Sequence, residues 1–136
     1  MTLLPYVVET ANPQMSLKDY LLHQLRWART YRVCRPKGYL AYGITHALVW
    51  SLAAWLAAGT PALGLVAAAL VGRGVVAFFS ERLCLRGSLP AWAFLLLPIK
   101  DLVAFGLWLL SFAGNEVTWR GSRFRLSREG LLSPLD

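Results

Sequence analysis

The side chains best suited to chemistry lie near the start of the chain, where three arginines recur at every third position. Arg26, Arg29 and Arg32 form a slowly drifting stripe on a helix, because residues three apart are neighbours on a helical surface. Guanidinium groups in such a stripe can bind the phosphates of lipid headgroups. Trp27 lies beside the stripe, and an indole is a common anchor at the membrane interface. The pattern indicates an amphipathic helix lying in the interface, with Trp and Leu toward lipid and Arg toward the headgroups.

The helix that must position these residues has recognisable ends. Ser16 followed by Asp19 forms a capping box, which marks a helix start. Pro36 disfavours helical geometry in the residue before it, so we expect the helix to end before Pro36. Ahead of this helix, residues 3–10 have the pattern of a β-strand that has no partner strand within the chain.

The overall composition indicates a membrane protein. The chain has 136 residues, of which 57% are hydrophobic and 15% charged, and a formal net charge of +7. A soluble domain would contain about 25% charged residues, and a disordered chain would have low hydrophobicity. Two cysteines and no recognisable secretory signal exclude a disulfide scaffold. A small basic membrane protein, or the membrane part of a larger one, remains.

The central apolar region predicts a transmembrane helical hairpin. Residues 38–72 contain no Asp, Glu, Lys or Arg, and this run is too long for one span of roughly 20 residues. Gly59-Thr60-Pro61 supplies a turn, so we expect spans over about 39–58 and 61–81. Cations gather just before the run and in the C-terminal tail, which favours a cytoplasmic location for both ends of the hairpin.

Two charged positions interrupt the apolar segments. Arg73 lies inside the second span, and we expect it either to contact a phosphate or polar headgroup or to pair with Glu81 or another helix. Lys100 and Asp101 divide the third apolar segment, residues 90–115, into two short halves. Charge placement favours a re-entrant or interfacial pair of short helices there, although a single crossing with a neutralised Lys-Asp pair is the alternative.

The C-terminal tail predicts a small β-hairpin. Two alternating runs flank Gly121-Ser122, a two-residue hairpin signal. An isolated hairpin is marginal in water, so we expect it to lie against the membrane surface or another domain. The expected fold class is therefore mainly α and membrane-bound, with an interfacial amphipathic helix, a transmembrane helical hairpin, a broken or re-entrant third apolar segment and a small C-terminal β-hairpin.

The segment His23-Gln24-Leu25-Arg26-Trp27 resembles the (Q/R)xxRW signature of lipid-directed family 2 glycosyltransferases. Its surroundings are similar to ceramide glucosyltransferases and closer still to bacterial hopanoid-biosynthesis glycosyltransferases. The resemblance covers essentially the whole chain through further motifs: VVET at 7–10, KDYLLHQLRWART at 18–30, RPKGY at 35–39, LLPIKDLVAF at 96–105 and WRGSRFRL at 119–126.

The resemblance implies a substrate-binding role for three residues. Arg26 would neutralise charge near the donor diphosphate or its leaving group, and Trp27 would line the acceptor pocket. His23 occupies the position of the Gln or Arg in the motif, where an imidazole can still donate a hydrogen bond to a phosphate or sugar. The alternative for Arg26 is a headgroup contact, and for Trp27 an interfacial anchor. Arg29 and Arg32 are expected to contact lipid.

The resembled enzymes have a preceding nucleotide-sugar domain with a D-x-D metal site and a later Asp as general base. This chain has no D-x-D, and its three aspartates are Asp19, Asp101 and Asp136. The cysteines and histidines show no metal-site spacing, and His46 is expected to be a bonded interior residue. We therefore expect no metal site and no catalytic base here, with the base upstream, and no glycosyl transfer by this chain alone.

These observations predict a C-terminal piece of such an enzyme in three parts. Residues 1–37 would be the end of the glycosyltransferase domain with the R-W helix, 38–115 the membrane domain, and 116–136 a cytoplasmic tail hairpin. The complete enzyme would use a nucleotide sugar and Mg or Mn to glycosylate ceramide, a hopanoid or a similar lipid hydroxyl.

The expected partners are membrane lipid, the lipid acceptor and the missing N-terminal glycosyltransferase domain. The expected location is a multi-pass membrane position, in the bacterial inner membrane, with both termini cytoplasmic. The alternative is a non-enzymatic small membrane protein that binds anionic lipid through its basic helix. Nucleic acid is not an expected partner, because the cations flank apolar spans instead of forming a free basic face.

Overall fold

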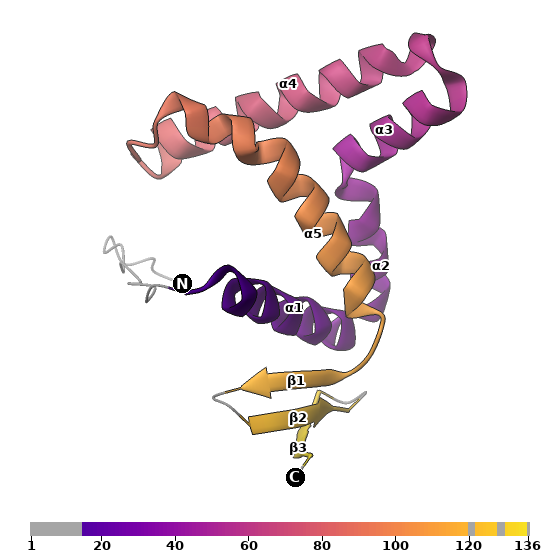
Figure 1. Cartoon of the computed structure of the whole chain (residues 1–136), viewed down its shortest axis with the longest axis vertical. Helices are drawn as coiled ribbons and strands as arrows, with labels where there is room; N and C mark the ends of the chain where they lie inside the picture. The colour runs from indigo at the N-terminus through magenta and orange to yellow at the C-terminus, as the bar shows by residue number, and fades with distance from the viewer. Residues whose placement is uncertain (1–14, 120–121, 128–129, 136) are drawn as a thin grey trace, which may run out of the picture.

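Five α-helices, four shorter helical turns and a small antiparallel sheet make up the part of the protein that the structure describes (Figure 1). The computed structural model describes residues 15–119, 122–127 and 130–135, with Trp119 described by its backbone only; the strand expected over residues 3–10 lies outside them. The α-helices are α1 (Leu17–Cys34), α2 (Pro36–Tyr42), α3 (Ala47–Ala58), α4 (Leu63–Phe79) and α5 (Leu97–Ser111). Shorter helical turns are η1 (Gly43–Thr45), η2 (Thr60–Ala62), η3 (Ser80–Cys84) and η4 (Ala91–Leu96). The strands are β1 (Glu116–Trp119), β2 (Ser122–Leu126) and β3 (Leu132–Pro134).

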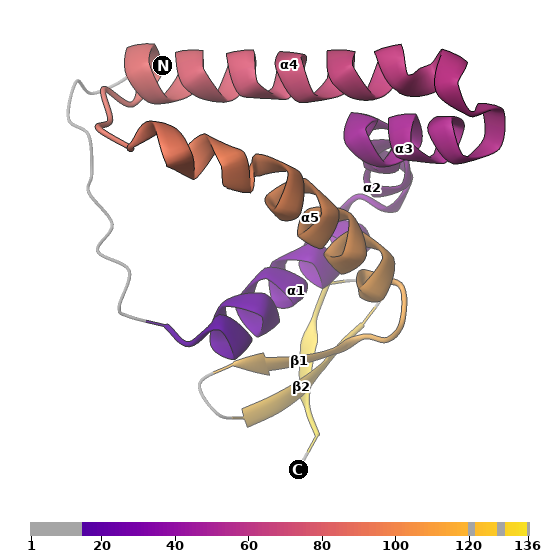
Figure 2. The ribbon, with the colours of Figure 1, turned by 45° about the horizontal axis from the view of Figure 1, so that its top comes forward.

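The helices form an open arrangement rather than a closed bundle. Helices α3 and α4 run antiparallel and in contact, and α5 leads back from the far end of α4 toward α1 (Figure 2). Helix α1 packs against α5, and the sheet lies beside α1 at the end of the molecule remote from α4 (Figures 1 and 2). The arginine-rich α1 and the arginine-rich sheet therefore lie together, away from the apolar hairpin.

The ends of α1 agree with the sequence prediction. The Ser16 hydroxyl oxygen accepts a hydrogen bond from the Asp19 backbone N–H at 3.2 Å, which satisfies one of the free donors of the first turn. The helix ends at Cys34, and Pro36 begins α2 after a single linking residue. Proline suits the first turn of a helix because its missing N–H would have no partner there.

Among the described residues, two helical segments are long and apolar enough to cross a membrane. These segments are Thr60–Cys84 and Ala91–Ser111. The turn between the first two apolar segments lies where it was predicted. The predicted turn is present, with Gly59 at a φ of 72° and Pro61 inside η2. The first apolar segment, predicted as a span over about 39–58, is bent, because Pro36–Thr45 and Ala47–Ala58 meet at an angle of 58°; the two helices are long and apolar enough for a span only when taken together.

Two indoles stabilise this bend. The Trp108 side-chain N–H donates to the Tyr39 carbonyl at 3.0 Å, and the Trp50 side-chain N–H donates to the Gly43 carbonyl at 2.8 Å. These bonds satisfy backbone groups that would otherwise be costly in an apolar environment. Gly43 also permits close packing, since a Cβ there would lie 2.5 Å from Cζ2 of Trp108.

The third apolar segment is one continuous helical run, which agrees with the alternative of a single segment and not with the favoured division at Lys100 and Asp101. The 3₁₀ turn η4 leads directly into α5, which passes through both residues. The helix accommodates Asp101 because Arg73 of α4 pairs with it, with Nε 2.9 Å from Oδ2. Of the partners expected for Arg73, the structure therefore has another helix and not Glu81.

The predicted C-terminal hairpin is present and belongs to a three-stranded antiparallel sheet in the order β1-β2-β3. Trp119 pairs with Ser122, so Ser122 belongs to β2 and not to the turn, and Gly121, the other residue of the predicted turn, lies outside the described residues. Strand β3 was not predicted. Val117 and Leu126 are buried, and β1 of the sheet contacts α1; contact with the membrane surface or another domain stays a prediction.

Candidate functional site

The three residues of the R-W signature lie together on α1. The Trp27 side-chain N–H donates to Nε2 of His23 at 2.9 Å, and Nη2 of Arg26 lies 3.2 Å from Nδ1 of the same ring. A neutral imidazole has one lone pair, so His23 can accept from only one of these two donors. When it accepts from Trp27, the Arg26 guanidinium keeps its N–H groups for another acceptor.

Trp27 forms one wall of a groove between α1, α2 and α5. Its indole is 45% exposed and stacks on Tyr31, with ring centroids 5.7 Å apart. The groove has a volume of about 750 Å³, and Tyr39, Leu107 and Trp108 are among its apolar and aromatic lining residues. This size and lining are typical of sites for small or lipid-like molecules. His23 and Arg26 lie beside the groove on the same helix and do not line it.

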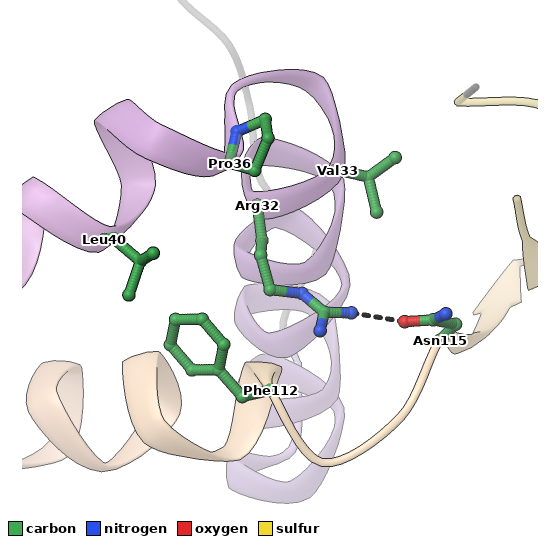
Figure 3. Close-up of a pocket in the computed structure, with 6 residues that line it drawn as sticks. All are labelled: Arg32, Val33, Pro36, Leu40, Phe112 and Asn115. Carbon is green, nitrogen blue, oxygen red and sulfur yellow. Dashed lines mark hydrogen bonds between the residues drawn. The ribbon is translucent and has the colours of Figure 1, made fainter. Parts of the chain in front are cut away.

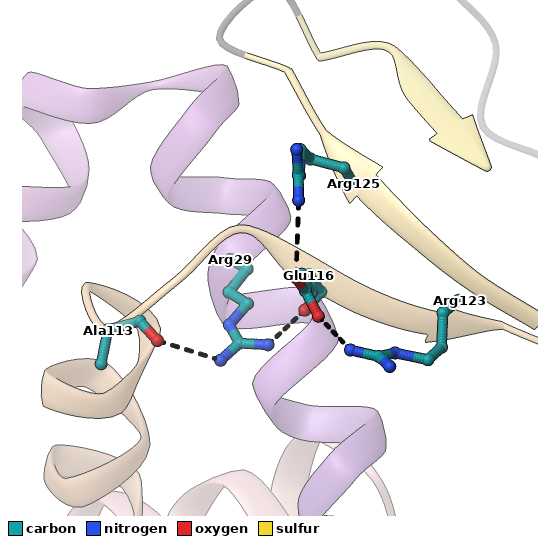
Figure 4. A network of polar contacts seen from close by, with 5 residues as sticks. All are labelled: Arg29, Ala113, Glu116, Arg123 and Arg125. Carbon is teal, nitrogen blue, oxygen red and sulfur yellow. Dashed lines mark hydrogen bonds and ion pairs between the residues drawn. The ribbon is translucent and has the colours of Figure 1, made fainter. Parts of the chain in front are cut away.

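Arg29 and Arg32 connect α1 to the segment that joins α5 to β1. Arg29 donates to the carbonyl oxygens of Glu116 and, at 3.5 Å, of Ala113 (Figure 4). Arg32 donates to the Gly114 carbonyl at 3.0 Å and to the Asn115 side chain. These two arginines were expected to contact lipid; the N–H groups that make these bonds are used within the chain, and lipid contact by the rest of each side chain stays a prediction.

Arg32 also lines a smaller pocket of about 400 Å³ at the same junction (Figure 3). Its guanidinium carbon lies 5.7 Å from the centre of the Phe112 ring, a distance suited to a cation–π contact. Pro36 and Leu40 of α2 form the other side of the pocket. The cation therefore fixes the position of α1 relative to α5, which together form the groove.

A cluster of charges covers the sheet next to α1 (Figure 4). The Glu116 carboxylate accepts from Nη2 of Arg123 at 2.5 Å and lies 3.8 Å from Nη2 of Arg125. The hydrogen bond from Arg123 and its charge hold the pKa of Glu116 below its ordinary value. Burial lowers the pKa of Arg29, and the neighbouring Arg32 charge adds to this effect, whereas Glu116 opposes it.

The described residues bring no group of three or more His, Cys, Asp or Glu side chains together. The divalent metal that the resemblance implies for the complete enzyme therefore finds no fitting donor set among them. His46 is buried, as expected for an interior residue, and its ring lies 5.3 Å from that of Phe105. Its Nε2 has no hydrogen-bond partner in the described part of the chain.

The part of the groove that comes from α2 and α5 was not predicted from the sequence. Tyr39 and Tyr42 are three positions apart on α2, and Ala104 lies three and four positions before Leu107 and Trp108 on α5. This spacing places each set on one helix face and is a local signal of a shared apolar wall. It did not indicate which helices would meet.

The family model for glycosyl transferase family 21 matches residues 1–132. Searches among curated proteins and among solved structures gave no significant match.

Proposed function

The chain belongs to glycosyl transferase family 21, and from that premise we propose that it forms the membrane-anchoring, acceptor-side part of a lipid glycosyltransferase. The complete enzyme would move a hexose from a nucleotide sugar to a hydroxyl of ceramide, a hopanoid or a similar lipid. The observation that supports this most is the aromatic groove with Trp27 in its wall, which lies next to the Arg26 guanidinium and the His23 imidazole on α1.

Each signature residue has a distinct role in this proposal. The lipid acceptor lies in the groove with its hydroxyl at the α1 end, where Trp27 covers it. Arg26 donates to the phosphate oxygens of the leaving nucleotide diphosphate, because a guanidinium stays charged and can bind two oxygens at once. His23 orients the Trp27 indole through the 2.9 Å hydrogen bond and contributes its second nitrogen to the sugar or phosphate.

In our proposal, a separate nucleotide-sugar domain supplies the divalent metal and the general base of the reaction. Residues 1–136 contain no D-x-D, and Arg26 alone cannot deprotonate an acceptor hydroxyl. We expect that domain to dock beside α1 and the sheet, where the arginines gather, on the cytoplasmic face of a bacterial inner membrane.

The alternative is a non-enzymatic protein that binds anionic lipid through a basic helix. It has less support, because two of the three arginines of the stripe donate to residues 113–116 of the same chain. The N–H groups of Arg29 and Arg32 that make these bonds are therefore not available to lipid headgroups.

The test combines this chain with the nucleotide-sugar domain in membranes, with radiolabelled nucleotide sugars and lipid acceptors. We expect Arg26→Ala to reduce the rate of sugar transfer about 100-fold or more, because the variant loses a group that stabilises charge in the transition state. We expect Trp27→Ala to raise the KM for the lipid acceptor more than the KM for the nucleotide sugar. Lys18→Ala, an exposed cation on the same helix, is the matched control. Full activity of Arg26→Ala would refute the assignment.

A further inference from the structure

A second cavity, of about 670 Å³, lies between α3, α4 and α5 and differs from the groove in its charge. Arg73, Lys100 and Asp101 all line it, although they belong to the two segments that are long and apolar enough to span a membrane. Ionisable side chains in such segments are costly and usually mark a binding site or pathway. The proposed role of the groove does not use any of these three residues.

The three charges do not cancel one another. Nε of Arg73 donates to both carboxylate oxygens of Asp101, at 3.0 and 2.9 Å. This pairing uses one nitrogen of the guanidinium, and among the described residues the two terminal nitrogens of Arg73 have no hydrogen-bond acceptor. Lys100 likewise has no ion-pair partner within the described ranges. The three charges of the cavity wall therefore sum to one positive unit, and the terminal N–H groups of Arg73 and the Lys100 ammonium remain unused as donors within the described residues.

The charged groups are also reachable from outside the protein. The Arg73 side chain is 41% exposed, whereas Asp101 is 17% exposed, so the carboxylate is the buried partner that orients the guanidinium. His46 lines the same cavity, and its Nε2 has no partner in the described part of the chain. The cavity wall thus combines two cations that can donate to a ligand, Arg73 and Lys100, with the imidazole of His46.

We propose that this cavity binds the phosphodiester of an anionic membrane phospholipid. A phosphodiester carries one negative charge, which matches the one unbalanced positive charge of the wall. The terminal nitrogens of Arg73 and the ammonium of Lys100 donate to the phosphate oxygens, and Asp101 positions Arg73. The acyl chains lie along the exposed apolar surfaces of α4 and α5, where Val76, Leu102 and Val103 are exposed. This lipid is a bound component distinct from the acceptor.

The experiment measures lipid retention by the purified full chain in detergent, using native mass spectrometry. The chain is mixed with phosphatidylglycerol or with phosphatidylcholine that has the same acyl chains. Lys100→Gln is the main variant because it leaves the Arg73–Asp101 pair intact. The double variant Arg73→Gln/Asp101→Asn removes that pair without leaving an unbalanced charge. Lys37→Gln and Arg86→Gln remove equivalent cations that do not line the cavity.

We expect the wild type and both control variants to retain one phosphatidylglycerol in preference to phosphatidylcholine. We expect Lys100→Gln to lower that retention about fivefold, as for loss of one cation near a lipid phosphate, and the double variant to lower it further. Millimolar inorganic phosphate is the arm that distinguishes a free anion from a lipid headgroup, and it should not displace the lipid. Equal retention in all variants, equal retention of the two lipids, or displacement by inorganic phosphate would each overturn the proposal. The readout needs no glycosyl transfer, so the proposed function and this site fail independently.

Discussion

Replacing Arg29 by methionine tests how the R-W helix is held in place. Methionine keeps an unbranched stem of similar width and removes the guanidinium, so packing changes little while the hydrogen bonds disappear. Arg29 donates to the carbonyls of Glu116 and Ala113, at the point where the chain passes from α5 into β1. We therefore expect the sheet to detach more readily from α1 in Arg29→Met.

The magnitude follows from the two bonds. A hydrogen bond from a charged donor contributes about 1.5–3 kcal/mol, and the bond to Ala113 at 3.5 Å adds little because it is at the limit of useful geometry. A total of about 2–3 kcal/mol corresponds to roughly a 30- to 150-fold change in the opening equilibrium. Arg32 binds the neighbouring residues independently, so the sheet should loosen without unfolding.

Hydrogen exchange of the backbone amides of β1 and β2 measures this opening directly. The protection factors of the sheet amides should fall by roughly 30- to 150-fold, whereas the protection factors in α3 and α4 should stay unchanged. Arg35→Met is the matched control, because Arg35 is exposed and lies outside the sheet junction. Unchanged protection in Arg29→Met, or an equal loss in Arg35→Met, would refute the role assigned to Arg29.

Two further predictions concern the bend and the sheet. Gly43→Ala should destabilise the chain by about 1–3 kcal/mol in thermal unfolding, because its Cβ would lie 2.5 Å from a Trp108 ring atom. Gly38→Ala should not, because a Cβ there would make only an ordinary contact, 3.9 Å from Cβ of Arg35. The lowered pKa of Glu116, caused first by the Arg123 hydrogen bond, stabilises the sheet above the ordinary carboxyl pKa of 4.5. That stabilisation of the sheet is lost as pH falls below 4.5 and through the lowered pKa of Glu116. Hydrogen exchange of the sheet amides should show this acid transition. The same acid transition in Glu116→Gln would contradict the role of Glu116.

Features set by neighbouring residues were predictable from the sequence. The cap at Ser16, the stop before Pro36 and the turn at Gly59 each depend on a few adjacent positions, and the structure has all three. The run from 38 to 72 without charges likewise required a turn, because its length exceeds one membrane crossing.

Features set by distant residues were not predictable. The bend at Gly43 depends on the Trp108 indole from α5, and no local pattern indicates that these helices meet. Arg29 has the same spacing as a lipid-facing arginine, but it binds backbone carbonyls of Ala113 and Glu116. Every residue has a backbone carbonyl, so the sequence of side chains does not indicate which carbonyl accepts a hydrogen bond from Arg29.

The continuity of α5 has a similar cause. A Lys-Asp pair in an apolar segment suggests an interruption when the segment is considered alone. The Arg73 side chain on α4 supplies the missing counter-charge for Asp101, so the helix continues. One part of the candidate site was therefore predictable from the sequence, because His23, Arg26 and Trp27 lie together on one helix. The α2 and α5 walls of the groove were not predictable, because they depend on how the helices pack.

Photo-crosslinking of a lipid acceptor tests the central claim most directly. Ceramide and a hopanoid alcohol, each with a diazirine in its apolar part, are irradiated with the chain in membranes, and the adducts are located by mass spectrometry. We predict adducts on the groove walls of α1, α2 and α5, including Tyr31 and Leu107, and fewer adducts in Trp27→Ala. Adducts confined to the outer faces of α3 and α4, with none in the groove, would contradict an acceptor site at the R-W helix.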